Sequence, residues 1–150
     1  MANVTQEEEP STLVRAMWTF LGYMLVGPLL AGLMTAAGLI VLPLVGMGAH
    51  LPQGLPTVGE AAAGAFVWAA IPAALAAIAV VPSVLRRGNF SWLTAAVAGG
   101  VAVFAAGVLT GQPPKDMMTI PAFLGALVSI GVREALISGR ILKAGTASPA

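Results

Sequence analysis

Residues 92–111 read WLTAAVAGGVAVFAAGVLTG, a stretch of twenty residues without a single charged side chain. As an α-helix, such a segment is about 30 Å long, which equals the hydrocarbon thickness of a bilayer. A membrane-spanning strand would alternate polar and apolar side chains, whereas this stretch is rich in alanine, valine and glycine without that alternation. It therefore predicts a transmembrane helix, which we place at residues 92–110.

Three further apolar stretches lie around it, at residues 17–46, 61–84 and 117–138. The 150-residue chain is 58% hydrophobic and 9% charged, whereas soluble domains carry roughly 25% charged residues. Such a chain has too few polar side chains to cover a water-exposed surface, so lipid must be the solvent for most of it. We expect an all-α polytopic membrane protein with four transmembrane helices in an antiparallel bundle.

The first apolar stretch, residues 17–46, is long for one crossing, but two crossings need about 40 residues. We expect one helix, in which Pro28 introduces a kink and Pro43 ends the helix before the loop. The alternative is a re-entrant half-hairpin that turns at Gly27 and Pro28. That arrangement would need surrounding protein to satisfy its backbone hydrogen bonds.

Polar segments bound the apolar region on both sides. Residues 1–15, with three glutamates and one arginine, lack the basic start and short apolar core of a secretory signal, so we expect a retained cytoplasmic tail. Residues 141–150 are small and polar and are predicted to form a second, flexible cytoplasmic tail. Residues 16–140 are then the transmembrane domain.

The basic residues predict the orientation of the spans. With a cytoplasmic amino end, Lys115 is the one basic residue outside, and six lie inside: Arg15, Arg86, Arg87, Arg133, Arg140 and Lys143. This asymmetry follows the positive-inside rule, so we expect both termini in the cytoplasm. We interpret Arg15, Arg86, Arg87, Arg140 and Lys143 as topology anchors that touch anionic lipid headgroups, in preference to a ligand site at the arginine pair. The short loops and this asymmetry favour a multi-pass protein of the bacterial inner membrane.

Small side chains recur at four-residue spacing in two of the predicted helices. Such spacing lets helix backbones approach closely, and this packing is a main source of helix association in lipid. We expect these residues to pack either inside the bundle or against another subunit. They are Ala98, Ala102 and Ala106, with Gly99 and Gly107 beside them, and Gly125 and Ser129 in the last helix.

Arg133 and Glu134 come closest to a charge pair inside the membrane. Arg133 lies about one turn short of the inner face, from which its long side chain can reach the interface. Alternatively, either residue pairs with a charge in the bundle or in a partner. Glu60 is expected at the start of the second helix, where the helix dipole favours a carboxylate, and His50 in a solvated loop.

Trp68 lies too deep in the second helix for the membrane interface, and Pro72 predicts a kink beside it. We expect Trp68 to fill packing space. A cofactor or quinone pocket is the alternative, although the sequence places no polar residue nearby to orient such a ligand. The absence of cysteine and the single histidine give no metal site, so we expect no cofactor.

The function class follows from these patterns. No catalytic set of side chains is recognisable, so we expect no enzyme, and a net charge of +1 excludes nucleic acid as a partner. We predict a small non-catalytic accessory or assembly subunit, in contact with the lipid bilayer and packed against other membrane subunits or itself. The alternative is a homo-oligomeric channel or small-solute transporter, although carriers often hold an embedded acid that this chain lacks.

Overall fold

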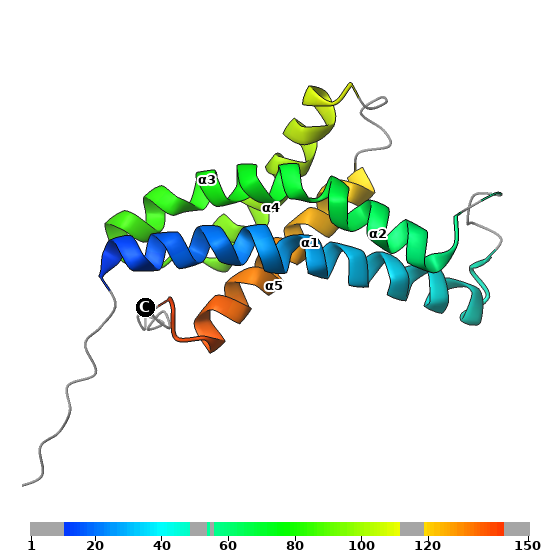
Figure 1. Ribbon diagram of the computed structural model, residues 1–150, viewed down its shortest axis with the longest axis horizontal. Coiled ribbons are helices and arrows are strands. Elements are labelled where there is room, and N and C mark those ends of the chain that lie inside the picture. Colours follow the sequence, from blue (N-terminus) through cyan, green and yellow to red (C-terminus); the bar gives the residue numbers. More distant parts are fainter. Residues whose placement is uncertain (1–10, 49–53, 55, 112–118, 143–150) are drawn as a thin grey trace, which may run out of the picture.

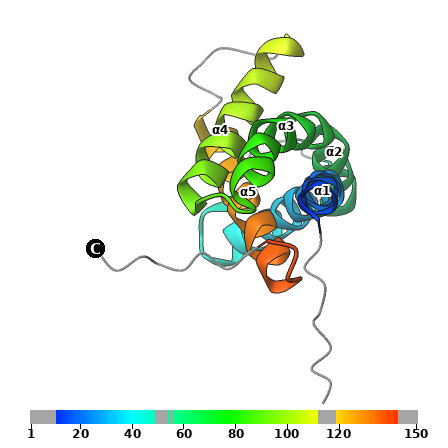
Figure 2. The same cartoon turned by 90° about the vertical axis from the view of Figure 1, so that its left-hand side faces the viewer.

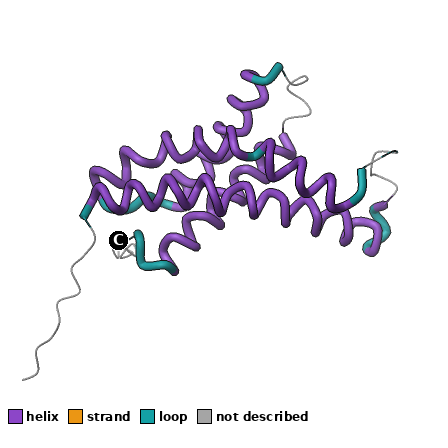
Figure 3. Tube along the Cα trace, viewed as in Figure 1, coloured by secondary structure: helices purple, strands orange, loops and turns teal. Residues whose placement is uncertain are grey.

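The computed structural model describes residues 11–48, 54, 56–111 and 119–142, and the helices within these residues are shown in Figures 1 and 3. No strand occurs among them. Four helical spans are long and apolar enough to cross a membrane: Thr12–Leu44, Val58–Arg87, Trp92–Leu109 and Thr119–Ser138. The prediction of an all-α chain with four helices long and apolar enough to span a membrane is confirmed within the described residues. His50, Lys115 and Lys143 lie outside the described residues.

The first span is one continuous helix, α1 (Thr12–Leu44). The side chain of Ser11 accepts a hydrogen bond from the Val14 amide and caps the first turn, which places Arg15 inside the helix and not in the polar tail. Pro28 lies within the helix without ending it, so the chain makes no re-entrant turn there. At 33 residues, α1 is about 50 Å long and exceeds the hydrocarbon thickness.

The second span is divided into α2 (Val58–Trp68) and α3 (Ala70–Arg87), with Ala69 between them. Pro72 has no amide hydrogen to donate to the Trp68 carbonyl, so the helical hydrogen bonding is interrupted at this point. The interruption lies beside Trp68, where the kink was expected. Gly88 ends α3 with a φ of 68°, a left-handed conformation that glycine adopts without steric cost.

The second span also begins earlier than residue 61, because a capping box holds its first turn. The Thr57 side chain accepts from the Glu60 amide at 3.3 Å, and the Glu60 carboxylate accepts from the Thr57 amide at 2.9 Å. These two bonds satisfy amides that the first turn of a helix leaves without partners. Glu60 therefore lies in the first turn of α2, where its charge also complements the helix dipole.

The last two helices, α4 (Trp92–Leu109) and α5 (Thr119–Ser138), pack most closely against each other. α1 lies along both halves of the second span and also contacts α5, while α3 packs on α4. Seen down the axis of α1, α3 and α5 lie between α1 and α4 (Figure 2). The core among these helices includes Tyr23 of α1, Val80 and Val84 of α3, and Val132 of α5, each at most 2% exposed.

The far half of α1 and the whole of α2 lie outside this core. None of residues 33–44 of α1 is buried, and none of the described residues of α2 is buried. In Figure 1 this pair of helices extends to the right, beyond α5. We call residues 33–44 together with Val58–Trp68 the α1–α2 arm.

Candidate functional site

Arginines from three parts of the chain gather at one end of the molecule. Arg15 Nη1 lies 3.1 Å from the position that a Cβ would take on Gly88, so the start of α1 meets the turn after α3. Arg86 and Arg87 occupy the last turn of α3, where cations complement the helix dipole. Arg133 of α5 donates from Nε to the Phe90 carbonyl at 2.8 Å. The topology anchors predicted on α1 and α3 therefore lie together, at what we call the basic end.

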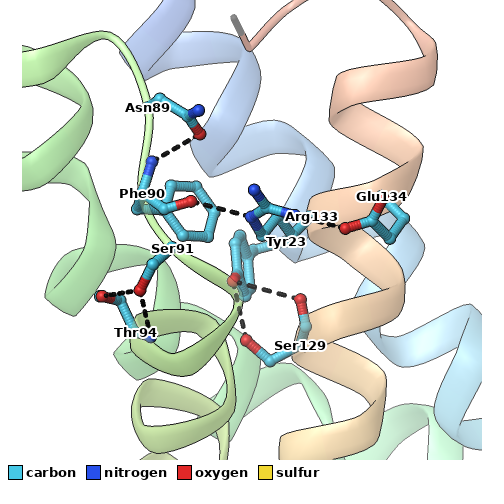
Figure 4. Close-up of polar contacts among 8 residues, drawn as sticks. All are labelled: Tyr23, Asn89, Phe90, Ser91, Thr94, Ser129, Arg133 and Glu134. Atoms are coloured by element: carbon cyan, nitrogen blue, oxygen red, sulfur yellow. Dashed lines mark hydrogen bonds and ion pairs between the residues drawn. The ribbon is translucent and has the colours of Figure 1, made fainter. Parts of the chain in front are cut away.

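Arg133 and Glu134 form an ion pair with each other (Figure 4). The Arg133 side chain is 13% exposed and that of Glu134 is 57% exposed, so the pair lies at the edge of the bundle. The bond from Arg133 to Phe90 ties α5 to the loop between α3 and α4. Within the described residues, Arg133 therefore donates a hydrogen bond to the Phe90 carbonyl and pairs with Glu134 of its own helix. It forms no ion pair with a charged residue on another described helix.

The small residues of α4 and α5 bring these two helices into backbone contact. A Cβ on Gly99 would lie 2.3 Å from the Gly125 carbonyl oxygen and 2.5 Å from the Ser129 Cβ. A Cβ on Gly125 would lie 2.3 Å from Val103 Cγ2. The other predicted packing residues of α4 are also buried by helices of the same chain: Ala98, Ala102, Ala106 and Gly107.

A second set of small residues lies uncovered on α2. Gly59 and Ala63 lie four residues apart on this helix, Gly64 follows Ala63, and all three are exposed. A Cβ on Gly59 or Gly64 would meet no atom within 4 Å. The apolar stretch predicted at residues 61–84 includes Ala63 and Gly64 but not Gly59, so the sequence did not connect the three residues on one helix. The Thr57–Glu60 capping box was the signal that could have placed Gly59 on the helix.

A cavity of about 370 Å³ lies among all four spans. Trp68 and Pro72 form part of its wall, where the second span is divided. Its surface is predominantly apolar, and the described residues that line it include no charged side chain. Its volume is within the range of small-molecule sites. The cavity therefore lies beside Trp68, where a pocket was the alternative to simple packing.

Two hydroxyl groups from distant parts of the sequence meet in the cavity wall. Tyr23 Oη of α1 and Ser129 Oγ of α5 are 2.8 Å apart, and Tyr23 Oη also lies 3.5 Å from the Ser129 carbonyl oxygen (Figure 4). Both residues are 2% exposed. The Tyr23 ring packs near that of Phe90, with centroids 6.4 Å apart. The polar groups that the sequence did not place near Trp68 are thus supplied by α1 and α5.

Among the described residues, no group of three or more His, Cys, Asp or Glu side chains could hold a metal ion. The chain matches no protein-family model, no curated protein and no solved structure.

Proposed function

We propose that the protein is a non-catalytic accessory or assembly subunit of a larger membrane complex. The observation that carries the proposal is the uncovered small-residue face of α2, formed by Gly59, Ala63 and Gly64. In a bilayer, close backbone approach at small residues drives helix association, since lipid and protein side chains are equally apolar. The corresponding residues of α4 and α5 are already used within the chain. The face on α2 is the place where a partner helix fits.

The exposed position of the α1–α2 arm supports the same proposal. The arm lies apart from the core, and its two helices expose large apolar side chains such as Leu33, Ile40 and Val67. A partner helix laid against α2 would bury part of this surface and would gain van der Waals contacts that mobile lipid chains provide less well. The partner is therefore an apolar transmembrane helix with small residues of its own.

Leucine substitutions on α2 test this face. Ala63→Leu or Gly64→Leu adds bulk where the chain itself leaves open space, so the fold is retained while close approach of a partner is blocked. We expect the wild-type chain, extracted in mild detergent, to carry stoichiometric foreign membrane subunits that either variant loses. Ala79→Leu, on the exposed face of α3, is the matched control and keeps them. Retention of the same subunits by all three variants would exclude the α2 face as the interface.

The homo-oligomeric channel or small-solute carrier is the second candidate, because another copy of the chain also fits the α2 face. In that case, the purified particle contains this chain alone at a defined multiple of its 15.1 kDa mass. The leucine variants on α2 then yield the monomer. Mass spectrometry of the extracted particle separates the two candidates.

The proposed orientation is an antiparallel bundle with both termini in the cytoplasm of a bacterial cell, spanning its inner membrane. The basic end supports it, because Arg15, Arg86 and Arg87 lie on the same side of the molecule as the loop that Arg133 contacts. These arginines then face anionic lipid headgroups.

Reporter fusions test this orientation directly. We expect fusions after residues 50, 88, 114 and 148 to report outside, inside, outside and inside in turn, because the positive-inside rule retains the basic end in the cytoplasm. Opposite sides for the fusions at 88 and 148 would contradict the four-span topology. An inverted but alternating pattern would contradict the charge argument alone.

A further inference from the structure

The cavity follows α1 as a long slot. Tyr23, Gly27, Ala31 and Thr35 line it at four-residue spacing, on one face of the helix. At 1.5 Å per residue, the distance from Tyr23 to Thr35 along the helix is about 18 Å. One lipid chain has a similar length, because two chains end to end fill a hydrocarbon core of about 30 Å. The slot therefore has the dimensions of a single extended hydrocarbon chain.

The walls of this slot select an uncharged ligand. Alanine, glycine, valine and proline make up most of the lining, and no charged side chain occurs among the described residues that form it. An ionised group in such surroundings would lose its hydration without gaining a partner, at a cost of several kcal/mol. The hydroxyls of Tyr23 and Ser129 are the polar groups at one end of the slot.

One of the two hydroxyl protons of Tyr23 and Ser129 is available for a hydrogen bond to a ligand. If Tyr23 donates to Ser129 Oγ, the Ser129 proton has no acceptor among the described residues. If Ser129 donates to Tyr23, the Tyr23 proton has only the Ser129 carbonyl oxygen, at 3.5 Å. That distance is beyond the usual range for a hydroxyl donor. In either arrangement, the remaining proton can be donated to an acceptor oxygen of a ligand.

A buried aromatic residue that does not line the slot lies behind this hydroxyl pair. Phe90, which is 5% exposed, packs on the Tyr23 ring, and the bond from Arg133 to its carbonyl holds it in place. A charged headgroup at this end would find no counter-charge among the residues that line the slot. Farther along the slot, α2 packs mainly on α1, and it packs far less on α5 than α4 does, so the slot is less enclosed between α2 and α5. A ligand can therefore enter from the lipid with its hydrocarbon part trailing.

We infer that the slot binds a neutral lipid-soluble molecule, a long hydrocarbon chain that ends in an uncharged carbonyl group. The carbonyl oxygen accepts the hydrogen bond from the Tyr23–Ser129 hydroxyl pair, and the chain extends along α1 past Gly27 and Ala31 towards Thr35. The site lies within a single chain, so this inference is independent of the accessory role and of any partner.

Trp68 reports binding, because it lines the slot, whereas Trp18 and Trp92 are 49% and 60% exposed. The chain has three tryptophans, so a Trp18→Phe, Trp92→Phe variant leaves Trp68 as the single fluorophore. Purified in detergent, this variant is titrated with a fatty acid methyl ester brominated along its chain, since bromine quenches indole fluorescence on contact. We expect saturable quenching by the ester. The matched brominated alkane, the ionised brominated acid and a brominated phospholipid should quench more weakly.

Substitutions in the same background distinguish the contribution of the hydrogen bond to ester binding from the contribution of the space in the slot. The double substitution Tyr23→Phe, Ser129→Ala removes both hydroxyl protons, and it should weaken ester binding by about two- to tenfold and leave the alkane unchanged, as the loss of one hydrogen bond predicts. Either substitution alone leaves one hydroxyl that can still donate to the ester, so each single variant should bind it nearly as the parent does. Ala31→Leu fills the slot and should abolish saturable quenching. Ala37→Leu adds the same bulk to an exposed position of α1 that does not line the slot, and should bind the ester like its parent.

Three results would overturn the inference. The first is quenching that rises linearly with every brominated probe, since partition into the micelle alone explains it. The second is tighter binding of the ionised acid or the phospholipid than of the ester. The third is equal ester binding by the Ala31→Leu and Ala37→Leu variants.

Discussion

Gly99→Ala is expected to lower the free energy of unfolding by about 3 kcal/mol, at the upper end of overpacking effects. A mid-helix change from glycine to alanine ordinarily stabilises a helix by about 1 kcal/mol. Here the sign reverses, because the added Cβ would lie 2.3 Å from the Gly125 carbonyl oxygen. That atom is backbone and cannot rotate away, so α4 and α5 must separate and lose their contacts.

The neighbouring glycine is the matched control. A Cβ on Gly100 would lie 3.4 Å from the Ala122 carbonyl oxygen and 4.0 Å from the Ala126 Cβ, which are ordinary contacts. Gly100→Ala is therefore expected to be neutral or slightly stabilising. Both variants are measured by unfolding in mixed micelles, with helical circular dichroism as the signal. Similar stabilities for the two would show that α4 and α5 do not meet at Gly99.

Arg133→Met is expected to lower the free energy of unfolding by about 2 kcal/mol, the size of a hydrogen bond to a charged group. The substitution keeps an apolar side chain of similar length but removes the donor to the Phe90 carbonyl. Phe90 is 5% exposed, so no water readily replaces that donor. The loop between α3 and α4 would then lose its connection to α5, and the same mixed-micelle unfolding measures the loss.

Glu134→Gln distinguishes the contribution of the hydrogen bond between Arg133 and the Phe90 carbonyl from that of the ion pair between Arg133 and Glu134. The Glu134 side chain is 57% exposed, and exposed ion pairs contribute about 1 kcal/mol or less. We therefore expect Glu134→Gln to unfold nearly as the wild type does. If it costs as much as Arg133→Met, the ion pair and not the bond to Phe90 is the stabilising contact.

The four spans could be predicted from the sequence because each depends on a local property, a run of apolar residues long enough to cross the hydrocarbon core. The interruption at Ala69 could also be predicted from the sequence. Pro72 lacks the amide hydrogen for a helical hydrogen bond, whatever the tertiary position of the helix. The start of α2 was placed too late because apolar length was used and the Thr57–Glu60 capping box was not. Local hydrogen bonding would have corrected it.

The sequence alone did not distinguish which small residues pack inside the chain and which remain uncovered. Gly99 and Gly59 both lie in stretches with small side chains at four-residue spacing. The structure places Gly99 against Gly125, whereas the space around Gly59 is open. Spacing shows that a helix can be approached closely, but the neighbouring helix is chosen by how all the spans fit together.

The sequence by itself determined the four helical spans, which are long and apolar enough to cross a membrane, and the segments that carry the positive charge, because composition and backbone chemistry act over a few neighbouring residues. Only the tertiary structure decided the cavity and the hydroxyl pair in its wall. Tyr23 and Ser129 are 106 residues apart in the chain, and their contact exists because α1 and α5 pack side by side. A site assembled from all four spans has no local signature, since each of its residues is unremarkable within its own helix.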